Sequence, residues 1–241
     1  MPVYRLSSKI EFPHPELATE YDGLLAVGGD LSVERLLTAY ANGIFPWPSD
    51  GLPLAWWSPD PRFVLYPHAL TVPKSLARVL KKNTFTYTVD RCFAEVINHC
   101  RTAKRMGQDG TWITAKMEKA YIALHRAGYA HSVEAWSGDR LAGGLYGVSL
   151  GCCFFGESMF ALEPDASKCA FVRLAGGLHK QGCPLIDCQI YTDHLARFGA
   201  IEIPRTAFLG QLRAALQSAS PPINWGSLAS DLLHDTIQEG T

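Results

Sequence analysis

The stretch LAGGLYGVSLGCCFFGESMF, residues 141–160, predicts two strands that are joined at Gly151. Apolar and aromatic residues dominate both halves of the stretch. Before it, residues 130–136 (AHSVEAW) alternate as a half-buried strand does, and the SGDR segment between them is typical of a turn. Consecutive strands with short connections usually pair with one another. The sequence therefore predicts a three-stranded antiparallel meander.

Helical and strand patterns continue on both sides of this meander. Further strands are expected at residues 62–66, 84–89, 184–190 and 201–204. Helices are expected at residues 73–82, 91–103, 115–127, 167–180, 194–199 and 206–219. The segment 184–190, PLIDCQI, has the composition of a strand buried on both faces. This order predicts an α+β fold with a mixed sheet flanked by helices, and the segment after residue 219 is expected to be frayed.

The first 62 residues differ in composition from the rest. They contain eight of the 15 prolines, and residues 23–32 (GLLAVGGDLS) are expected to form a glycine-punctuated turn. Ser32 is a candidate N-cap for a short helix over residues 33–41. We therefore predict a small, loop-rich N-terminal domain at residues 1–62 and a larger domain at residues 63–241.

Composition excludes several classes of protein. The net charge is −1 and charged residues make up 19% of the chain, so no overall basic excess indicates nucleic acid binding. No apolar run approaches the roughly 18 residues of a membrane-spanning helix, and residues 1–15 lack the apolar segment of a secretory signal, so we expect a cytoplasmic protein with no membrane partner. The seven cysteines form no C-x-x-C pair and the histidines form no H-E-x-x-H motif. Neither a disulfide framework nor a metal site is expected.

Three polar residues stand in segments that are otherwise apolar. Glu157 follows Gly156 in the second strand of the meander, where a glycine often marks a β-bulge. Asp187 and Gln189 are two residues apart in the strand 184–190 and are expected to face the same side. One interpretation is structural, with these groups bonded to turns or to an arginine. The other is a shared polar pocket, in which Asp187 orients or deprotonates an amine and Glu157 holds a cation.

Aromatic and basic residues give a weaker signal for RNA. Tryptophans stand beside proline or glycine in the predicted loops, at Trp47, Trp56, Trp57 and Trp112. Most tryptophans pack in a core, but in loops they also stack on bases. Basic residues at helical spacing form one stripe, at Lys74, Arg78, Lys81 and Lys82. Such a stripe is usually a solvated helix face; beside loop tryptophans it also favours contact with phosphates.

Phosphate-binding loops are missing from the sequence. No G-x-x-x-x-G-K-S/T motif is present, and the nearest approach to a coenzyme A pyrophosphate loop, RLAGGL at residues 173–178, lies within an expected helix. No G-x-S-x-G motif is present either. An enzyme of this kind would use a substrate that is already activated.

An ordered set of short segments resembles the leucyl/phenylalanyl-tRNA–protein transferase family. The set spans residues 23–205 and consists of GLLAVGGDLS, NGIFPW, WWSPDPR, GTWIT, HSVEAW, GGLYGV, FFGESMF, LIDCQ and FGAIEIPR. The resemblance implies a larger domain of the GNAT type and a bacterial enzyme of the N-degron pathway. It also implies transfer of Leu or Phe, and less well Met, from aminoacyl-tRNA to proteins that begin with Arg or Lys, without cofactor or metal.

The resemblance also implies roles for individual residues. Asp187 is expected to accept the proton of the acceptor amine or to orient that amine, with Gln189 beside it, and Glu157 to lie beside the acceptor. The pocket for the donor side chain is expected to be lined by Leu145, Phe155, Gly156, Phe171 and Ile186. The terminal adenosine of the tRNA is expected to contact Tyr40, Trp47 and Trp112. The stripe of Lys74, Arg78, Lys81 and Lys82 is expected to meet tRNA phosphates.

Two other functions remain open at this point. A coenzyme A-dependent N-acetyltransferase of the same fold is disfavoured by the missing pyrophosphate loop. A non-catalytic RNA- or peptide-binding module is disfavoured by the three polar residues, because a plain binding sheet has little reason to bury them.

Overall fold

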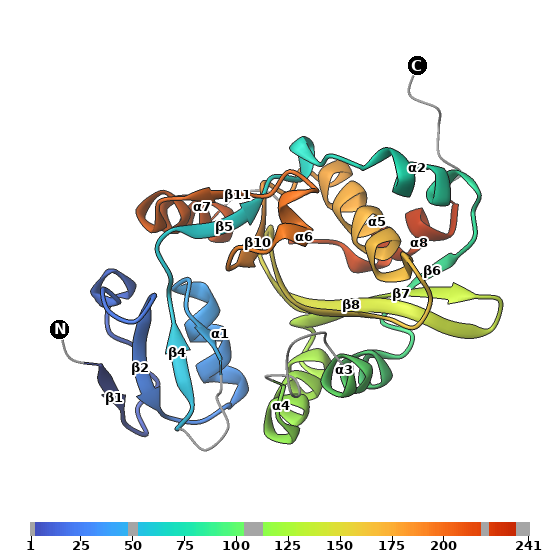
Figure 1. The fold of residues 1–241 in the computed structure, drawn as a ribbon. Helices are drawn as coiled ribbons and strands as arrows, with labels where there is room; N and C mark the ends of the chain where they lie inside the picture. The colour runs from blue at the N-terminus through green and yellow to red at the C-terminus, as the bar shows by residue number, and fades with distance from the viewer. Residues whose placement is uncertain (1–2, 48–52, 104–112, 218–221, 235–241) are drawn as a thin grey trace.

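The computed structural model describes residues 3–47, 53–103, 113–217 and 222–234, which form two β-sheets with surrounding helices (Figure 1). The larger sheet has seven strands in the order β11-β5-β10-β9-β8-β7-β6. Its strands are β5 (Arg62–Leu65), β6 (Thr86–Val89), β7 (Ala130–Ser137), β8 (Arg140–Leu150), β9 (Cys153–Ala161), β10 (Leu185–Gln189) and β11 (Ile201–Ile203). Strands β9 and β10 pair in parallel and every other pair in this sheet is antiparallel. The predicted meander, β7-β8-β9, and the mixed α+β sheet are confirmed.

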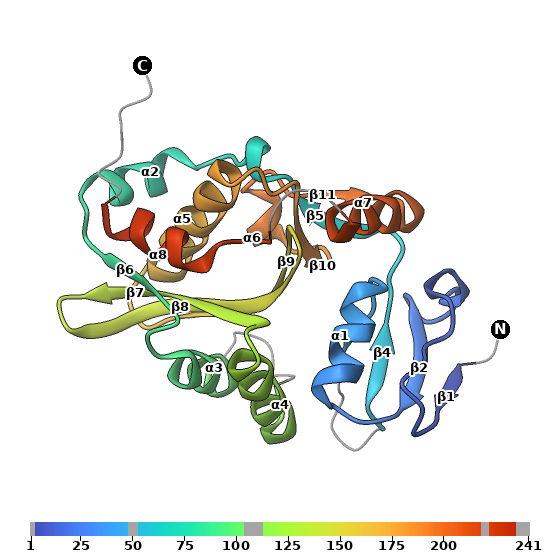
Figure 2. The same cartoon turned by 180° about the vertical axis from the view of Figure 1, so that it is seen from behind.

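Helices cover both faces of the larger sheet. The helices α3 (Phe93–Thr102) and α4 (Ala115–Arg126) lie on one face, and α5 (Ala166–Lys180) lies on the other (Figures 1 and 2). Two apolar clusters fill the spaces between sheet and helices, one on each side. Strands β8 and β10 are buried along nearly their whole length, which agrees with the apolar composition of both segments. Three further helices here are α2 (Lys74–Lys81), α6 (Asp193–Ala196) and α7 (Arg205–Gln217), with a 3-10 turn at Pro67–Ala69.

The N-terminal region contains more regular structure than its sequence indicates. Four short strands form a second sheet in the order β1-β2-β4-β3, beside α1 (Val33–Ala41) and a 3-10 turn at Pro15–Leu17. The strands are β1 (Tyr4–Leu6), β2 (Leu24–Gly28), β3 (Phe45–Pro46) and β4 (Ala55–Trp57). The predicted turn over residues 23–32 was therefore wrong in its first half, where Leu24–Gly28 form β2. Strands of two to five residues between prolines and glycines leave too short a pattern to recognise.

The chain passes from the small sheet to the large one at Arg62, the first residue of β5. Ser32 is the N-cap of α1, as predicted, and its Oγ accepts a hydrogen bond from the backbone N–H of Arg35. The proposed domain boundary between residues 62 and 63 stays a prediction.

The segment near the C-terminus was also predicted wrongly. Residues Trp225–His234 form helix α8, where a frayed tail was expected. Leu228 is fully buried, and the ring of Trp225 stacks on His131 of β7 with centroids 4.1 Å apart. Because α8 contacts α5 and β6, tertiary packing stabilises a helix that its composition did not predict.

Replacing Thr114 with alanine is expected to lower the free energy of unfolding by about 1 kcal/mol. Thr114 Oγ1 accepts a hydrogen bond from the backbone N–H of Met117 at 3.2 Å, which caps the start of α4. Urea unfolding of the two proteins measures the difference. Thr206, an exposed threonine of α7, is a matched control whose replacement by alanine should change stability by less than about 0.5 kcal/mol. Equal losses in both variants would contradict the capping role.

Candidate active site

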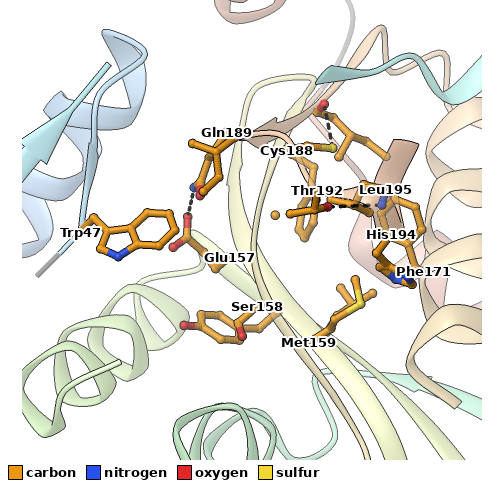
Figure 3. A pocket seen from close by; sticks show the side chains of 16 residues that line it. Trp47, Glu157, Ser158, Met159, Phe171, Cys188, Gln189, Thr192, His194 and Leu195 are labelled. Carbon is orange, nitrogen blue, oxygen red and sulfur yellow. Dashed lines mark hydrogen bonds between the residues drawn. The ribbon is translucent and has the colours of Figure 1, made fainter. Parts of the chain in front are cut away.

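An apolar cavity of about 330 Å³ lies at the junction of β8, β9 and β10 with α5 and α6 (Figure 3). Four of the five residues predicted to line a donor pocket lie there: Leu145, Gly156, Phe171 and Ile186. Sequence reasoning missed other apolar members of the lining, Phe154, Met159 and Leu195. Trp47, from the segment after β3, contributes to the wall on the side of Glu157 and Gln189. The cavity is therefore apolar at one end and polar at the other.

Phe155 does not line this cavity, which corrects the prediction. Its side chain is fully buried in the cluster on the opposite face of the sheet, 5.1 Å from the ring of Tyr40. Neighbouring residues of a strand point to opposite faces. Since Phe154 faces the cavity, Phe155 must face away from it.

A β-bulge in β9 sets the direction of Glu157. Tyr146 of β8 pairs with Ser158 and Gly147 pairs with Gly156, so Glu157 has no partner in the register. Strands β8 and β9 come so close here that a Cβ on Gly147 would lie 2.2 Å from the carbonyl oxygen of Phe155. The extra residue of a bulge re-aims its side chain. The irregularity that Gly156 indicated is thus confirmed, and it places Glu157 at the polar end of the cavity.

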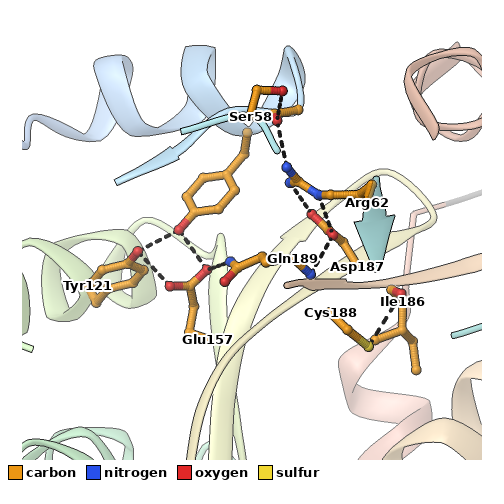
Figure 4. Close-up of polar contacts among 10 residues, drawn as sticks. Ser58, Arg62, Tyr121, Glu157, Ile186, Asp187, Cys188 and Gln189 are labelled. Carbon is orange, nitrogen blue, oxygen red and sulfur yellow. Dashed lines mark hydrogen bonds and ion pairs between the residues drawn. The ribbon is translucent and has the colours of Figure 1, made fainter. Parts of the chain in front are cut away.

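Three side chains donate hydrogen bonds to the Glu157 carboxylate (Figure 4). Tyr40 Oη and Gln189 Nε2 donate to Oε1 at 2.7 and 2.8 Å, and Tyr121 Oη donates to Oε2 at 2.8 Å. Tyr40 comes from α1, Tyr121 from α4 and Gln189 from β10. The carboxylate is therefore held by one strand of the larger sheet and by two helices, α1 beside the small sheet and α4 beside the large one.

Burial raises the pKa of Glu157 to about 7, although the three donated hydrogen bonds lower it. The neighbouring Asp187 adds a smaller upward contribution to this pKa through repulsion between like charges. Among the described residues, Glu157 forms no ion pair that would offset its burial. A carboxyl group that titrates near neutral pH can accept and release a proton under ordinary conditions.

Asp187 is held by a buried arginine. Arg62 Nε donates to Asp187 Oδ1 at 2.8 Å and Arg62 Nη2 donates to Oδ2 at 2.6 Å (Figure 4). Both side chains are fully buried. The structural interpretation considered from the sequence, a polar group bonded to an arginine, therefore holds for Asp187. This corrects its expected role as the group that deprotonates or orients an amine by direct contact.

The role of Asp187 is to shape the backbone of β10. Its Oδ1 accepts a hydrogen bond from the backbone N–H of Gln189 at 2.9 Å, and Gln189 has a φ of 67°, in the left-handed region. Non-glycine residues adopt this conformation at a cost and mostly at functional or turn positions. The strand register also shifts between Asp187 and Gln189. Asp187 thus positions Gln189, whose side chain reaches the cavity and Glu157.

The residues expected at the tRNA are found in different places. Tyr40 is fully buried and its hydroxyl is bonded to Glu157, so it presents no free ring face to a base, which corrects that prediction. Trp47 lies between the main cavity and a second one of about 250 Å³, lined also by Asp22, Phe45, Trp57, Pro59 and Ile190. Trp112 lies outside the described residues. The four basic residues Lys74, Arg78, Lys81 and Lys82 are all exposed on and directly after α2, which lies on the side of the molecule away from the small sheet (Figures 1 and 2).

Two residues of the polar network were also missed from the sequence, Arg62 and Tyr121. Arg62 is a lone cation at the start of an otherwise apolar strand, and Asp187 is a lone anion inside another. Two isolated opposite charges in strands expected to be buried are a signal for an ion pair. Tyr121 lies on the apolar face of its helix and gave no comparable signal.

Other kinds of site are not found in the described part of the chain. No group of three or more His, Cys, Asp or Glu side chains there is arranged to hold a metal ion. The described cysteines are all free thiols. No described helix is both long enough and apolar enough to cross a membrane.

An apolar cavity that ends at a carboxyl group titrating near pH 7 is typical of an enzyme that moves protons during a reaction. Comparison with known sequences gives the particular family. The profile of the leucyl/phenylalanyl-tRNA protein transferases matches residues 64–213, and the profile of their N-terminal domain matches residues 29–60. The chain belongs to this family of aminoacyltransferases.

Curated relatives agree with this result over nearly their whole length. A leucyl/phenylalanyl-tRNA–protein transferase of Anaeromyxobacter dehalogenans (strain 2CP-C) is 58% identical over 225 residues, 93% of this chain and 96% of that protein. A protein of the same name from Myxococcus xanthus (strain DK1622) is 54% identical, over 93% of this chain and 97% of that protein. A solved structure of L-PGS from Bacillus licheniformis has a TM-score of 0.36 and 12% identity, covering 70% of this chain and 56% of that one.

Proposed function

We propose that this enzyme transfers Leu or Phe, and less well Met, from aminoacyl-tRNA to the N-terminal Arg or Lys of proteins, which marks them for degradation. The observation that carries the proposal is the apolar cavity that ends at Glu157 and Gln189. An apolar side chain of the donor fits the apolar end, and the reacting ester would then lie at the polar end. An aminoacyl ester is already activated, so the reaction needs neither ATP nor a metal.

The lining of the cavity supports a donor with an apolar side chain. Leu145, Phe171 and Ile186 present only hydrocarbon surface to it. A Cβ added to Gly156 would meet only the carbonyl oxygen of Asp187, at 3.7 Å, so the absent side chain leaves open space at the reacting end. Hydrophobic pockets separate residues that differ by one methylene by only about 1–3 kcal/mol. Acceptance of Leu, Phe and Met together is therefore physically reasonable.

The tRNA would be held by stacking and by phosphate contacts. Trp47 lies at the polar end of the donor cavity, where the terminal adenosine follows the ester, and Trp57 shares the second cavity with it. The exposed basic residues of α2 would meet phosphates of the acceptor stem, and Trp112 stays a candidate for the adenosine. The strand and helix order supports a GNAT-type fold for the larger domain, and a tRNA-dependent activity implies a cytoplasmic location.

The experiment uses radiolabelled Leu-tRNA and peptides that begin with Arg, Lys, Asp or Ala. Label on the Arg and Lys peptides alone is expected, because a carboxylate at the reacting end attracts a cationic acceptor and repels an acidic one. Absence of label from folded protein that still binds the tRNA would contradict the transferase and favour an RNA- or peptide-binding module. Acetylation of the same peptides with acetyl-CoA would favour the acetyltransferase.

Removing two positive charges from α2 and the residue after it is expected to weaken tRNA binding. It should also make that binding depend less steeply on salt concentration. Lys81 and Lys82 are exposed, and removing one lysine that neutralises a phosphate lowers the slope of log K against log salt by about one unit. The double replacement by alanine should therefore reduce the slope by about two. Filter binding of Phe-tRNA between low and moderate salt measures it. Lys9 and Lys180, exposed on other segments, serve as a matched control pair; an unchanged slope after the α2 replacement would remove this helix from the tRNA interface.

A further inference from the structure

A closed ring of hydrogen-bond contacts joins the carboxyl group of Glu157 to the hydroxyl groups of Tyr40 and Tyr121. This ring lacks one proton when the carboxyl is ionised. The two hydroxyl groups lie 2.5 Å from each other, and each also contacts one carboxylate oxygen, at 2.7 and 2.8 Å. Three oxygen–oxygen contacts at hydrogen-bond distance need three hydrogens, but two phenols supply only two. One contact of the ring therefore stays without a hydrogen while Glu157 is a carboxylate.

The missing hydrogen can only enter at Glu157. Burial, with the charge of Glu157 as the next cause, raises the pKa of both Tyr40 and Tyr121 well above the ordinary value for a phenol. The phenols therefore keep their protons in the whole range in which proteins are active. A protonated Glu157 donates to one tyrosine, that tyrosine donates to the other, and the second tyrosine donates back to the remaining carboxyl oxygen. Such a closed chain strengthens each of its bonds.

We propose that Glu157 accepts the proton that the α-ammonium group of the acceptor must lose, and that Tyr40 and Tyr121 hold the protonated carboxyl in a closed hydrogen-bonded ring. The inference rests on the proposed function, which supplies an amine and an ester at the polar end of the cavity. It assigns the proton to Glu157 instead of Asp187, whose two oxygens are occupied by Arg62.

The steps balance in atoms and charge. The ammonium group gives one proton to the Glu157 carboxylate, and the neutral amine attacks the ester carbonyl carbon to form the new C–N bond. As the ester C–O bond breaks, the ribose oxygen takes the proton from the Glu157 carboxyl. The new amide nitrogen then gives its excess proton to the restored carboxylate, which releases it to water. The three hydrogens of the ammonium end on the amide, on the ribose and in solvent.

The groups around the ring are compatible with this cycle. Gln189 of β10 donates to Oε1 in either state of Glu157. Asp187 on the same strand acts on Glu157 by repulsion between like charges, and Tyr146 of β8 acts in the same sense on both ring tyrosines. Among the described residues no cation is paired with Glu157, so protonation breaks no ion pair.

The test compares native protein with Glu157→Gln in single-turnover transfer from Phe-tRNA to an Arg-starting peptide across pH. Glutamine supplies the third hydrogen permanently and keeps the ring, but cannot accept a proton. Its rate is expected to fall by about 10²–10⁴-fold, with the affinity for Phe-tRNA unchanged. Native protein should lose rate below an apparent pKa of about 7. We call this fall in rate the acid limb. Its midpoint should be the same with a peptide whose α-amine is more acidic, because the group that titrates belongs to the enzyme.

Tyrosine variants separate the ring from simple packing. Tyr121→Phe removes a donor to the carboxylate. Hydrogen bonds to an ionised group are stronger than those to a neutral one, so this loss should raise the pKa of Glu157. The midpoint of the acid limb should therefore move to higher pH. Tyr87, a buried tyrosine of β6 in the other apolar cluster, is the matched control, and Tyr87→Phe should leave the limb in place. Infrared titration of the Glu157 carboxyl in native protein, with the band assigned by its loss in Glu157→Gln, gives the same midpoint without any transfer assay.

The outcomes are distinct. A Glu157→Gln enzyme with the native rate and the native acid limb would overturn the inference, as would a carboxyl midpoint near the ordinary value of 4.5. A native protein that transfers no label to any peptide would instead overturn the proposed function. A rate loss with the expected limb in the native protein supports Glu157 as the proton acceptor.

Discussion

Replacing Arg62 by methionine is expected to lower the free energy of unfolding by about 3–5 kcal/mol. Arg62 and Asp187 are both fully buried and joined by two hydrogen bonds of 2.6 and 2.8 Å. Arg62 Nη1 also donates to the carbonyl oxygen of Gly43 at 3.1 Å, and the guanidinium lies over the rings of Phe45 and Phe208. Without the arginine, the Asp187 carboxylate would be left uncompensated in the core.

The size of this loss depends on the unpaired charge and not on the side-chain volume. The double variant Arg62→Met with Asp187→Leu removes both charges, and buried ion pairs can often be replaced by apolar residues at little cost. Urea unfolding should therefore show that the double variant recovers at least half of the loss. Further destabilisation in the double variant would mean that the bond from Asp187 to the backbone of Gln189 matters more than the charge.

The pairing of Arg62 with Asp187 could not be derived from the sequence. The strand 62–66 and the strand 184–190 were both predicted, and both are confirmed as β5 and β10. That they are neighbours in an antiparallel pair, with Asp187 beside Val64, is a property of the sheet order. A local pattern gives the period of a strand but not its partner. The ion pair could be suspected from two lone charges, but its geometry could not be derived.

The same limit applies to the candidate site. Gly156 indicated an irregular strand, and Glu157 and Gln189 were singled out because they are polar among apolar residues; both lie at the cavity. Tyr121 was missed because a tyrosine on the apolar face of a helix looks like any core residue. Phe155 was misplaced because the choice between the two faces of β9 depends on the position of the bulge. The short strands of the small sheet lacked a readable period altogether.

Glu157→Gln is expected to stabilise the protein at pH 8 by about 2–3 kcal/mol and to have little effect at pH 5. The pKa of Glu157 is raised in the folded protein from 4.5 to about 7. The folded state therefore binds more protons than the unfolded state between these values, and the free energy of unfolding falls as pH rises through that range. The shift corresponds to about 3 kcal/mol, and the partial exposure of Glu157 to the cavity reduces this toward about 2 kcal/mol. Glutamine removes the titration and keeps the ring closed at every pH.

Urea unfolding of both proteins at pH 5 and pH 8 measures this difference. Glu11→Gln, at an exposed glutamate, is the matched control, and its small effect should be the same at both pH values. If the Glu157→Gln difference did not depend on pH, the carboxyl would ionise normally in the folded protein and could not serve as the proton acceptor near neutral pH. A gain in stability together with a loss of transfer rate would mean that the native glutamate is retained against its own destabilising effect, because the reaction needs a carboxylate in a ring that is one proton short.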